Sequence, residues 1–293
     1  MHKLENSLQE HQGGGHIPRP DWLKIRPSGG KGFSQLRVLL REQKLHTVCE
    51  EARCPNINEC WNLGTATFLI MGDICTRNCR FCAIRSNKPL PLDPDEPLRI
   101  AESVNTMNVR HAVITSVNRD DLPDGGSHHW AETIRQTRML NPGVTIEVLI
   151  PDFCGSFRDV DAVLGENPDI LNHNIETVPS LYSKIRPKAK YETSLAILKH
   201  SADKGFKVKS GIMVGLGETN KEVFAVMSDI KNTGAEIITI GQYLQPSRKH
   251  AQVKRYVRLS EFDEYKAYGI GLGFGHVESG PLVRSSYHAG KHV

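Results

Sequence analysis

A repeated alternation of strand-like and helix-like segments follows Trp61, and it constrains the fold more than any other feature of the sequence. Six runs rich in β-branched or other apolar residues are each followed by an amphipathic stretch. Such units form a parallel sheet with right-handed crossovers. Six of them predict an α/β fold, a partial (β/α)6 barrel that is TIM-like but two units short of a closed eight. The expected strands lie at 65–73, 111–117, 145–153, 169–176, 207–216 and 235–244, and the expected helices at 97–107, 128–140, 158–166, 191–205, 221–234 and 260–271.

The residues on either side of this barrel divide the chain into three parts. We expect an N-terminal extension over 1–61, the barrel over 62–274 and a C-terminal segment over 275–293. The start of the extension is polar and interleaves glycine with proline. This composition predicts an extended arm that packs on a neighbour through Trp22 and Leu23.

Composition and charge exclude several classes of protein. The chain has 293 residues and a net charge of +4, because 37 Lys and Arg oppose 33 Asp and Glu. A charge this small does not predict a nucleic-acid-binding face. Apolar runs such as 68–71 are far shorter than the roughly 20 residues of a membrane span. The N-terminus is polar where a secretion signal needs an apolar stretch, so we expect a cytoplasmic protein without a membrane segment.

Cysteines supply the chemistry of the candidate site. An odd number of them, with no expected secretion signal, indicates metal ligands or reactive thiols and argues against a disulfide framework. All but one fall within residues 49–82, which is a high local density. The seven are Cys49, Cys54, Cys60, Cys75, Cys79, Cys82 and Cys154.

Cys75, Cys79 and Cys82 form a C-x3-C-x2-C pattern directly after the first expected strand. Thiolates hold iron–sulfur clusters, and a four-iron cubane with three protein ligands leaves one iron open to another molecule. A zinc site is the alternative, although it would normally add a second cysteine pair or histidines. The polar loops after the strands, at 73–82, 116–121, 172–177, 215–219 and 241–250, are expected to open on one face.

This loop, with Phe81 before its last cysteine, resembles the signature of the radical S-adenosylmethionine (SAM) superfamily. In that family the open iron binds SAM, and one electron cleaves SAM to a 5′-deoxyadenosyl radical. The resemblance makes Cys75, Cys79 and Cys82 the catalytic cluster ligands. It also implies cofactor contacts at the strand ends: Thr115 and Ser116 near the methionine amino group, Asn174 and Glu176 near the ribose, and Gly215, Gly217 and Glu218 near the adenine.

Further motifs resemble the lipoyl synthase family from about Trp22 to Ala289: CEEARCPNINECW, TSVNRDDLPDGG, KSGIMVGLGET and GPLVRSSYHAG. The resemblance implies a second, auxiliary 4Fe-4S cluster, held by Cys49, Cys54, Cys60 and a serine of the RSSY segment. Ser286 is favoured over Ser285 as that ligand. Both ends of the chain would then cap the barrel mouth.

Two residues stand apart from these motifs. The family usually has Asp where this chain has Asn118, so a carboxylate is missing beside Arg119. Cys154 belongs to neither cysteine set, and we expect it to be a small buried hydrophobic residue.

The reaction implied by the resemblance inserts two sulfur atoms at C6 and C8 of an octanoyl chain on a carrier lysine, with the auxiliary cluster as sulfur donor. The implied cofactors are two 4Fe-4S clusters and SAM. The implied carriers are acyltransferase subunits of 2-oxoacid dehydrogenases and the glycine cleavage carrier protein, which are generally acidic around the modified lysine. Basic residues at the mouth are candidates to dock them: Arg80, Arg85, Lys88, Arg248 and Lys249.

A low-potential electron donor such as ferredoxin or flavodoxin, and an iron–sulfur carrier that rebuilds the auxiliary cluster, are also implied. Two other functions remain alternatives at this point. One is another radical sulfur-inserting enzyme, acting on biotin precursors or tRNA. The other is an iron–sulfur electron carrier or scaffold, which would explain the cysteines but not the polar loops on one face of a barrel.

Overall fold

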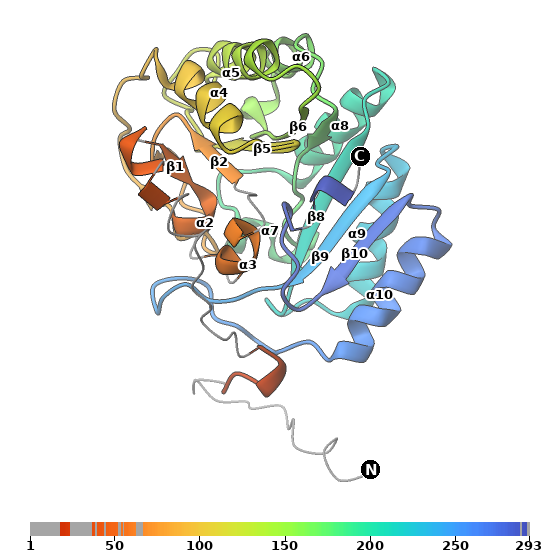
Figure 1. Ribbon diagram of the computed structural model, residues 1–293. Coiled ribbons are helices and arrows are strands. Elements are labelled where there is room, and N and C mark those ends of the chain that lie inside the picture. Colours follow the sequence, from red (N-terminus) through yellow and green to blue (C-terminus); the bar gives the residue numbers. More distant parts are fainter. Residues whose placement is uncertain are drawn as a thin grey trace.

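A single curved sheet with helices on its outer face forms the body of the protein, as the computed structural model shows (Figure 1). The structure describes residues 18–23, 37–38, 40–43, 45–51, 54, 56–62, 67–287 and 289–291. The order of the strands in the sheet is β1 (His46–Thr47), β2 (Thr67–Ile70), β5 (His111–Ser116), β6 (Thr145–Leu149), β7 (Ile170–Asn172), β8 (Val208–Val214), β9 (Ile237–Gln242) and β10 (His276–Gly280).

The pairing of the strands agrees with the expected partial barrel. Neighbouring strands from β2 to β10 are parallel, and β1 adds antiparallel to β2. Among the described residues β1 and β10 do not pair, so the sheet stays open. All six expected strands are present, as β2 and β5 to β9. The seventh parallel strand, β10, was not expected, because a short run of mixed polar and apolar residues ending in glycine carries little strand signal.

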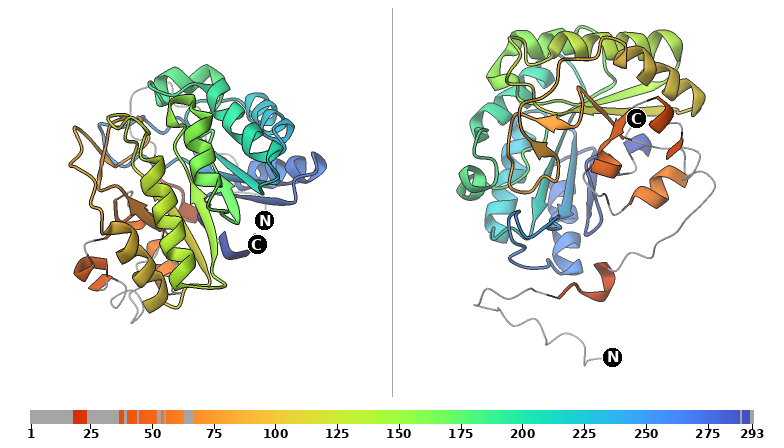
Figure 2. Two further views of the ribbon diagram at one scale, coloured as in Figure 1. Left: turned by 90° about the horizontal axis from the view of Figure 1, so that it is seen from above. Right: turned by 90° about the vertical axis from the view of Figure 1, so that its left-hand side faces the viewer.

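Helices cover the outer face of the sheet (Figure 2). All six expected helices are present: α4 (Glu96–Thr106), α5 (Ser127–Leu140), α6 (Phe157–Leu164), α8 (Tyr191–Asp203), α9 (Asn220–Asn232) and α10 (Leu259–Gly271). Shorter elements were not predicted: η1 (Asp21–Leu23), α2 (Val48–Glu51), α3 (Ile57–Asn62), β3 (Ile74–Cys75), β4 (Arg85–Ser86), η2 (Phe153–Gly155), α7 (Pro179–Ile185) and η3 (Ala289–Lys291). In the part of the chain that is described, no helix is long and apolar enough to cross a membrane.

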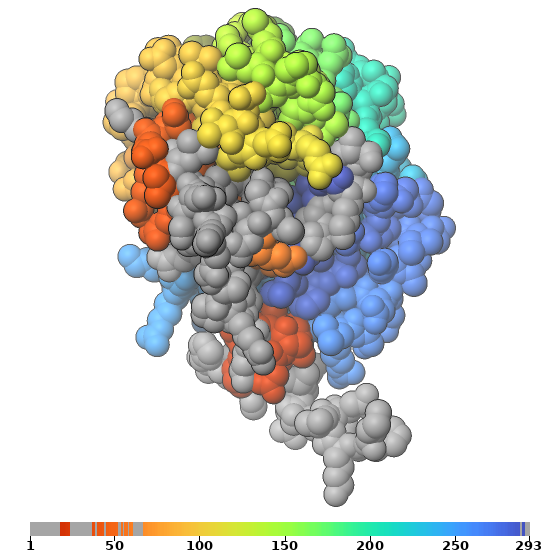
Figure 3. Space-filling view, in the orientation of Figure 1, coloured from red at the N-terminus to blue at the C-terminus, as the bar shows by residue number. Residues whose placement is uncertain are grey.

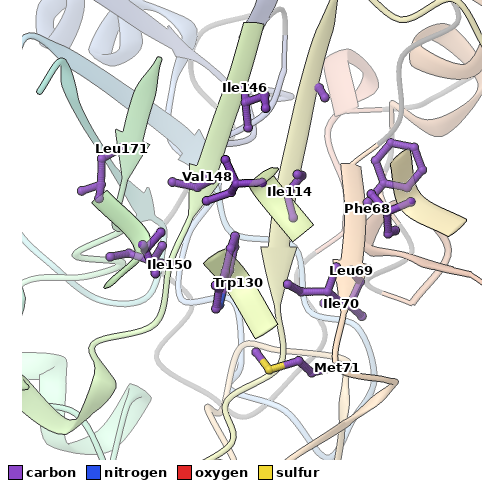
Figure 4. Close-up of a cluster of buried hydrophobic side chains, with 14 of the residues drawn as sticks. Phe68, Leu69, Ile70, Met71, Ile114, Trp130, Ile146, Val148, Ile150 and Leu171 are labelled. Carbon is purple, nitrogen blue, oxygen red and sulfur yellow. The ribbon is translucent and has the colours of Figure 1, made fainter. Parts of the chain in front are cut away.

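The core lies between the sheet and these helices and continues inside the curve. Because helices cover one face and the chain fills the other, β2 and β9 are buried along their whole length, as in other parallel sheets. Figure 4 shows Ile114 and Val148 from neighbouring strands near Trp130 of α5, with Phe68 farther along the same cluster. Leu23 of η1 is also buried, as expected of the N-terminal arm.

A buried ion pair crosses the sheet. The ammonium group of Lys209 on β8 lies 2.9 Å and 3.0 Å from the carboxylate oxygens of Glu147 on β6, and both side chains are fully buried. Asn172 of β7 donates to the same carboxylate at 3.0 Å. Burial alone would raise the pKa of Glu147, but Lys209 and these hydrogen bonds hold it well below its usual range.

The C-terminal residues lie inside the curve of the sheet, where Figure 1 marks the end of the chain. Gly241 of β9 allows this close approach, because a Cβ atom there would lie 2.2 Å from the carbonyl oxygen of Val283. Gly290 reaches the side chain of His111 at the start of β5. The segment therefore extends from the ends of the strands down into the open barrel.

Candidate active site

The loop with Cys75, Cys79 and Cys82 follows β2, at the end of the sheet where the other strand-end loops meet. Two backbone N–H groups donate to the Cys75 sulfur, that of Asn118 at 3.3 Å and that of Arg77 at 3.4 Å. The N–H of Cys82 donates to the carbonyl of Cys79 at 3.0 Å, which folds the loop back on itself. Neighbouring loops thus position the three thiols together.

A buried arginine clamps this loop to two others. Arg77, only 5% exposed, makes bidentate contacts with Asp152 at 2.6 Å and with Asp120 at 2.8 and 2.9 Å. Arg77 thereby joins the loops after β2, β5 and β6. Planar guanidinium–carboxylate pairs of this kind fix orientation as well as charge. The sequence did not reveal Arg77 as a site residue, because its partners lie in two separate loops.

The donor set suits an iron–sulfur cluster. All three cysteines are free thiols. The pKa of Cys82 is raised to about 12, mainly by burial and to a lesser extent by the neighbouring Cys79 and Cys75. Burial likewise raises the pKa of Cys79. Such thiols keep their protons until a metal displaces them, so cluster binding would release protons.

Asn118 lies directly against the first cysteine. Its carbonyl accepts hydrogen bonds from the N–H of Thr76 at 3.1 Å and from the Thr76 hydroxyl at 3.0 Å. Its side-chain oxygen lies 4.0 Å from the Cys75 sulfur. The amide therefore places a neutral group beside this thiol, where a carboxylate would place a negative charge.

The two residues expected near the methionine amino group differ in whether their hydroxyl groups already have hydrogen-bond partners. The hydroxyl of Thr115 donates to the carbonyl of Leu149 at 2.8 Å and so links β5 to β6. The buried hydroxyl oxygen of Ser116 has no hydrogen-bond partner among the described residues. Ser116 is thus the one of the pair that keeps an open hydrogen-bonding group for a ligand.

Asn174 and Glu176 lie together beyond the end of β7. The amide nitrogen of Asn174 donates to Glu176 at 3.2 Å, while its side-chain oxygen is buried without a partner in the described structure. Glu176 has a positive φ of 73°, which is unusual outside glycine, and burial raises its pKa. An unsatisfied buried acceptor and a strained backbone at one point are typical of a ligand-binding position.

A buried arginine supports these two residues. A guanidinium nitrogen of Arg186 donates to the Asn174 carbonyl at 3.0 Å and to the hydroxyl of Tyr182 at 2.7 Å. The same cation opposes the rise in the pKa of Glu176. Arg186 lies in the YSKIRP motif, but its contact with the β7 loop depends on α7, which was not expected from the sequence.

The glycine-containing loop after β8 is held by its own glutamate. Gly215 has a φ of +98°, and a Cβ there would lie 2.6 Å from the backbone oxygen of Arg255. Glu218 accepts the N–H groups of Gly215 at 2.5 Å and of Leu216 at 2.9 Å. The carbonyl of Gly215 accepts the N–H of Lys254 at 2.8 Å. The carboxylate of Glu218 therefore shapes this loop, and the backbone of Gly215 is already satisfied within the chain.

The second cysteine set, Cys49, Cys54 and Cys60, lies on the short helices α2 and α3 and the link between them. The N–H of Cys54 donates to the carbonyl of Cys49 at 3.0 Å. The pKa of Cys60 is raised to about 12, mainly by burial and to a lesser extent by the nearby Cys49 and Cys54. None of the three is in a disulfide, and their influence on one another is expected of ligands of one cluster.

The RSSY segment, 284–287, contacts this second set from the other end of the chain. The Arg284 guanidinium opposes the rise in the pKa of Cys54, and the Tyr287 hydroxyl donates to Glu59 at 3.2 Å. Asn56 also donates to the carbonyl of Leu282 at 2.7 Å. The two ends of the chain therefore meet at the second cysteine set.

The two serines of this segment face different neighbours. The hydroxyl of Ser285 accepts a hydrogen bond from the amide of Asn174 at 2.7 Å, on the candidate SAM side. The hydroxyl of Ser286 accepts one from Thr67 at 2.8 Å, at the start of β2.

The expectation that Cys154 is buried was wrong. Its side chain is exposed, in a turn with a φ of +53°, because η2 bends the chain outward after β6. Its sulfur lies 3.4 Å from Arg77 and 3.5 Å from Asp120. It lines a cavity of about 380 Å³ between the loops after β5 and β6, together with Asn118 and Phe153.

Comparisons with known proteins agree with this geometry. Residues 69–230 match the model of the radical SAM superfamily, and residues 1–54 match the N-terminal domain of lipoyl synthase of the radical SAM family. A lipoyl synthase of Pelodictyon phaeoclathratiforme is 56% identical over 94% of this chain and 95% of its own length. One of Parabacteroides distasonis is 52% identical over 95% and 99%. The chain belongs to the lipoyl synthase family. As a member it is a radical SAM enzyme that uses a 4Fe-4S cluster and SAM.

Solved structures support the fold of this lipoyl synthase family member. SuiB of Streptococcus suis bound to S-adenosylmethionine has a TM-score of 0.58 at 10% identity, over 73% of this chain and 50% of its own. The hydrogenase maturase HydG of Carboxydothermus hydrogenoformans has a TM-score of 0.55 at 15% identity, over 74% and 59%. At these identities the likeness shows a shared fold.

Proposed function

We propose that this radical SAM enzyme inserts two sulfur atoms, at C6 and C8, into an octanoyl chain on the lysine of a carrier protein. The observation that carries the proposal is the pair of cysteine triads, one at the strand ends and one where residues 56–59 meet the segment 282–287. A single triad would serve radical formation alone. A second triad gives the protein a place for a sulfur source.

Cys75, Cys79 and Cys82 would hold the cluster that binds SAM. When bound, the cluster and SAM supply a 5′-deoxyadenosyl radical, which can remove hydrogen from carbons that no side-chain base can attack. Ser116, Asn174 and the backbone of Gly217 would hold SAM, because Ser116 and Asn174 keep buried polar atoms without partners in the described part of the chain and Gly217 has no Cβ to keep a ligand away. The remaining predicted contacts, Thr115, Glu176, Gly215 and Glu218, would shape and orient this pocket.

Cys49, Cys54 and Cys60 would hold the auxiliary cluster, with Ser286 as the fourth ligand. The support for Ser286 is that Ser285 faces Asn174 on the candidate SAM side, whereas Ser286 faces Thr67 at the start of β2, away from that side. An oxygen ligand is a poorer match for iron than thiolate. The iron at Ser286 would therefore be the easiest to release when sulfur is withdrawn.

The remaining assignments follow the same proposal. The extension 1–61 and the segment 275–293 would carry the auxiliary cluster on either side of the barrel 62–274. The substrates would be octanoylated acyltransferase subunits of 2-oxoacid dehydrogenases and the glycine cleavage carrier protein. Ferredoxin or flavodoxin would supply electrons, and an iron–sulfur carrier would restore the auxiliary cluster.

Anaerobic turnover with a defined substrate tests the proposal. Fully loaded protein should contain about eight irons per chain. With SAM, dithionite and an octanoyl-lysyl peptide, it should form 5′-deoxyadenosine, and mass spectrometry should detect a peptide that has gained two sulfur atoms. Formation of 5′-deoxyadenosine without any sulfur-containing peptide would contradict the proposed function.

A further inference from the structure

Three segments at the mouth of the barrel, each following a strand, carry many basic residues and few acidic ones. They are 71–95 after β2, 173–190 after β7 and 243–258 after β9. Together they contain 13 of the 37 Lys and Arg, four, four and five respectively, and four of the 33 Asp and Glu, namely Asp73, Asp93, Asp95 and Glu176. This excess of basic residues contrasts with the small net charge of the whole chain.

These loops form one continuous surface around the first cluster loop. The N–H of Arg80 donates to the carbonyl of Ile185 at 2.8 Å, and the N–H of Ala251 donates to the carbonyl of Arg80 at 2.8 Å. The ammonium of Lys188 donates to the carbonyl of Thr76 at 2.8 Å. We define the basic rim as the exposed side chains Arg80, Lys184, Lys188, Arg248 and Lys249 on these loops.

The basic rim is not neutralised within the chain. None of its five side chains forms an ion pair in the described part of the structure. Two of the acids in these segments pair with other arginines: Asp73 pairs with Arg85, and Asp93 pairs with Arg99. The loop after β9 projects outward on the left of the molecule (Figure 3). The rim therefore presents free positive charge to a partner.

The other half of the mouth differs. The loops after β5 and β6 carry Asp120, Asp121 and Asp152, each paired with Arg77 or Arg119. Charges there neutralise one another and hold the site together. A partner that recognises charge would therefore be drawn to the half with the rim.

We propose that the basic rim is the docking surface for an acidic patch on the folded carrier domain that presents the acyl-lysine. This inference rests on the proposed function and adds where the carrier binds. Arg80 lies between Cys79 and Cys82 in the sequence, so a carrier held by the rim would present its lysine arm beside the first cluster. Charge complementarity of this kind speeds association and selects the partner.

Reversing the charge of rim residues tests whether the rim contributes to carrier binding and not to the reaction itself. The variant Arg248→Glu/Lys249→Glu alters two rim residues that have no side-chain contact with either cysteine set. The control Arg110→Glu/Lys266→Glu reverses two exposed charges away from the rim, one before β5 and one on α10. Each variant would be assayed with dithionite on an octanoylated glycine cleavage carrier protein and on a short octanoyl-lysyl peptide without acidic residues.

We expect the rim variant to lose about 10-fold or more in kcat/KM for the carrier at low salt. Its activity on the peptide, and that of the control on both substrates, should stay within about twofold of the unmodified enzyme, since surface charges far from a neutral substrate contribute little. Added salt should shrink the difference, because it screens the attraction.

Three results would overturn the docking proposal: no loss with the carrier, an equal loss with the peptide, or a loss that appears only when flavodoxin replaces dithionite. The last would assign the basic rim to the electron donor. Failure of the unmodified enzyme to add sulfur even to the peptide would instead contradict the proposed function.

Discussion

The two cysteine triads are alike in composition but are built in different ways. Cys75, Cys79 and Cys82 lie in one loop that is fixed by neighbouring strand-end loops and by the buried Arg77. Cys49 and Cys60 lie on short helices outside the barrel, and their surroundings include residues from the far end of the chain. The barrel itself therefore fixes the first triad, whereas closure of the chain completes the second.

This difference suggests a division of labour. A site that must generate a reactive radical benefits from a rigid frame, because a small displacement of the reacting groups costs much of the rate. A site that gives up its own atoms must be dismantled and refilled. Attachment through short helices and a C-terminal segment allows that without disturbing the sheet.

The largest expected effect comes from removing the first triad. Replacing Cys75, Cys79 and Cys82 with alanine should abolish 5′-deoxyadenosine and therefore all sulfur insertion, while about four irons remain on the other triad. Iron analysis and chromatography of the nucleoside measure both. SAM cleavage by this variant would show that the triads have been assigned to the wrong roles.

Removing the second triad should separate the two activities. Replacement of Cys49, Cys54 and Cys60 with alanine should leave SAM cleavage in place, because the first loop does not depend on these residues. No sulfur should enter the octanoyl chain, as mass spectrometry of the peptide would show. A normal lipoyl product would mean that the sulfur comes from elsewhere.

Variants of the two serines test the same comparison, and we expect them to have smaller effects than removal of either triad. Ser286→Ala should impair sulfur insertion more than SAM cleavage, and Ser286→Cys should retain four irons but release them poorly, since thiolate is the preferred ligand. Ser285→Ala serves as the matched control and should lose one hydrogen bond, about 0.5–1.5 kcal/mol. Iron content, 5′-deoxyadenosine and lipoyl product would be measured for all three. A severe defect confined to Ser285→Ala would move the ligand to that residue.

The sequence was most informative where a site is local. All six barrel strands, their helices and the first cysteine loop could be predicted, because periodicity and spacing are properties of consecutive residues. β10 and α7 could not, since each is short and gains its order from the sheet or loops on which it packs.

Contacts between distant loops could not be predicted. The clamp of Arg77 on Asp120 and Asp152 joins three separate strand ends, and no spacing in the chain indicates it. The opposite directions of Ser285 and Ser286 follow from the path of the backbone inside the sheet. Cys154 was misplaced because a turn after a strand can expose a residue that is usually buried.

Asn56 and Leu282, which hydrogen-bond where the two ends of the chain meet, are 226 positions apart. At about 5–20 residues per second, a ribosome needs roughly 10 to 45 seconds to make the chain between them. For nearly all of that interval the three thiols of the second triad have been synthesised, but Ser286, proposed above as the fourth ligand, has not. With that ligand set, the auxiliary cluster would have to be completed after the last residues of the chain have left the ribosome.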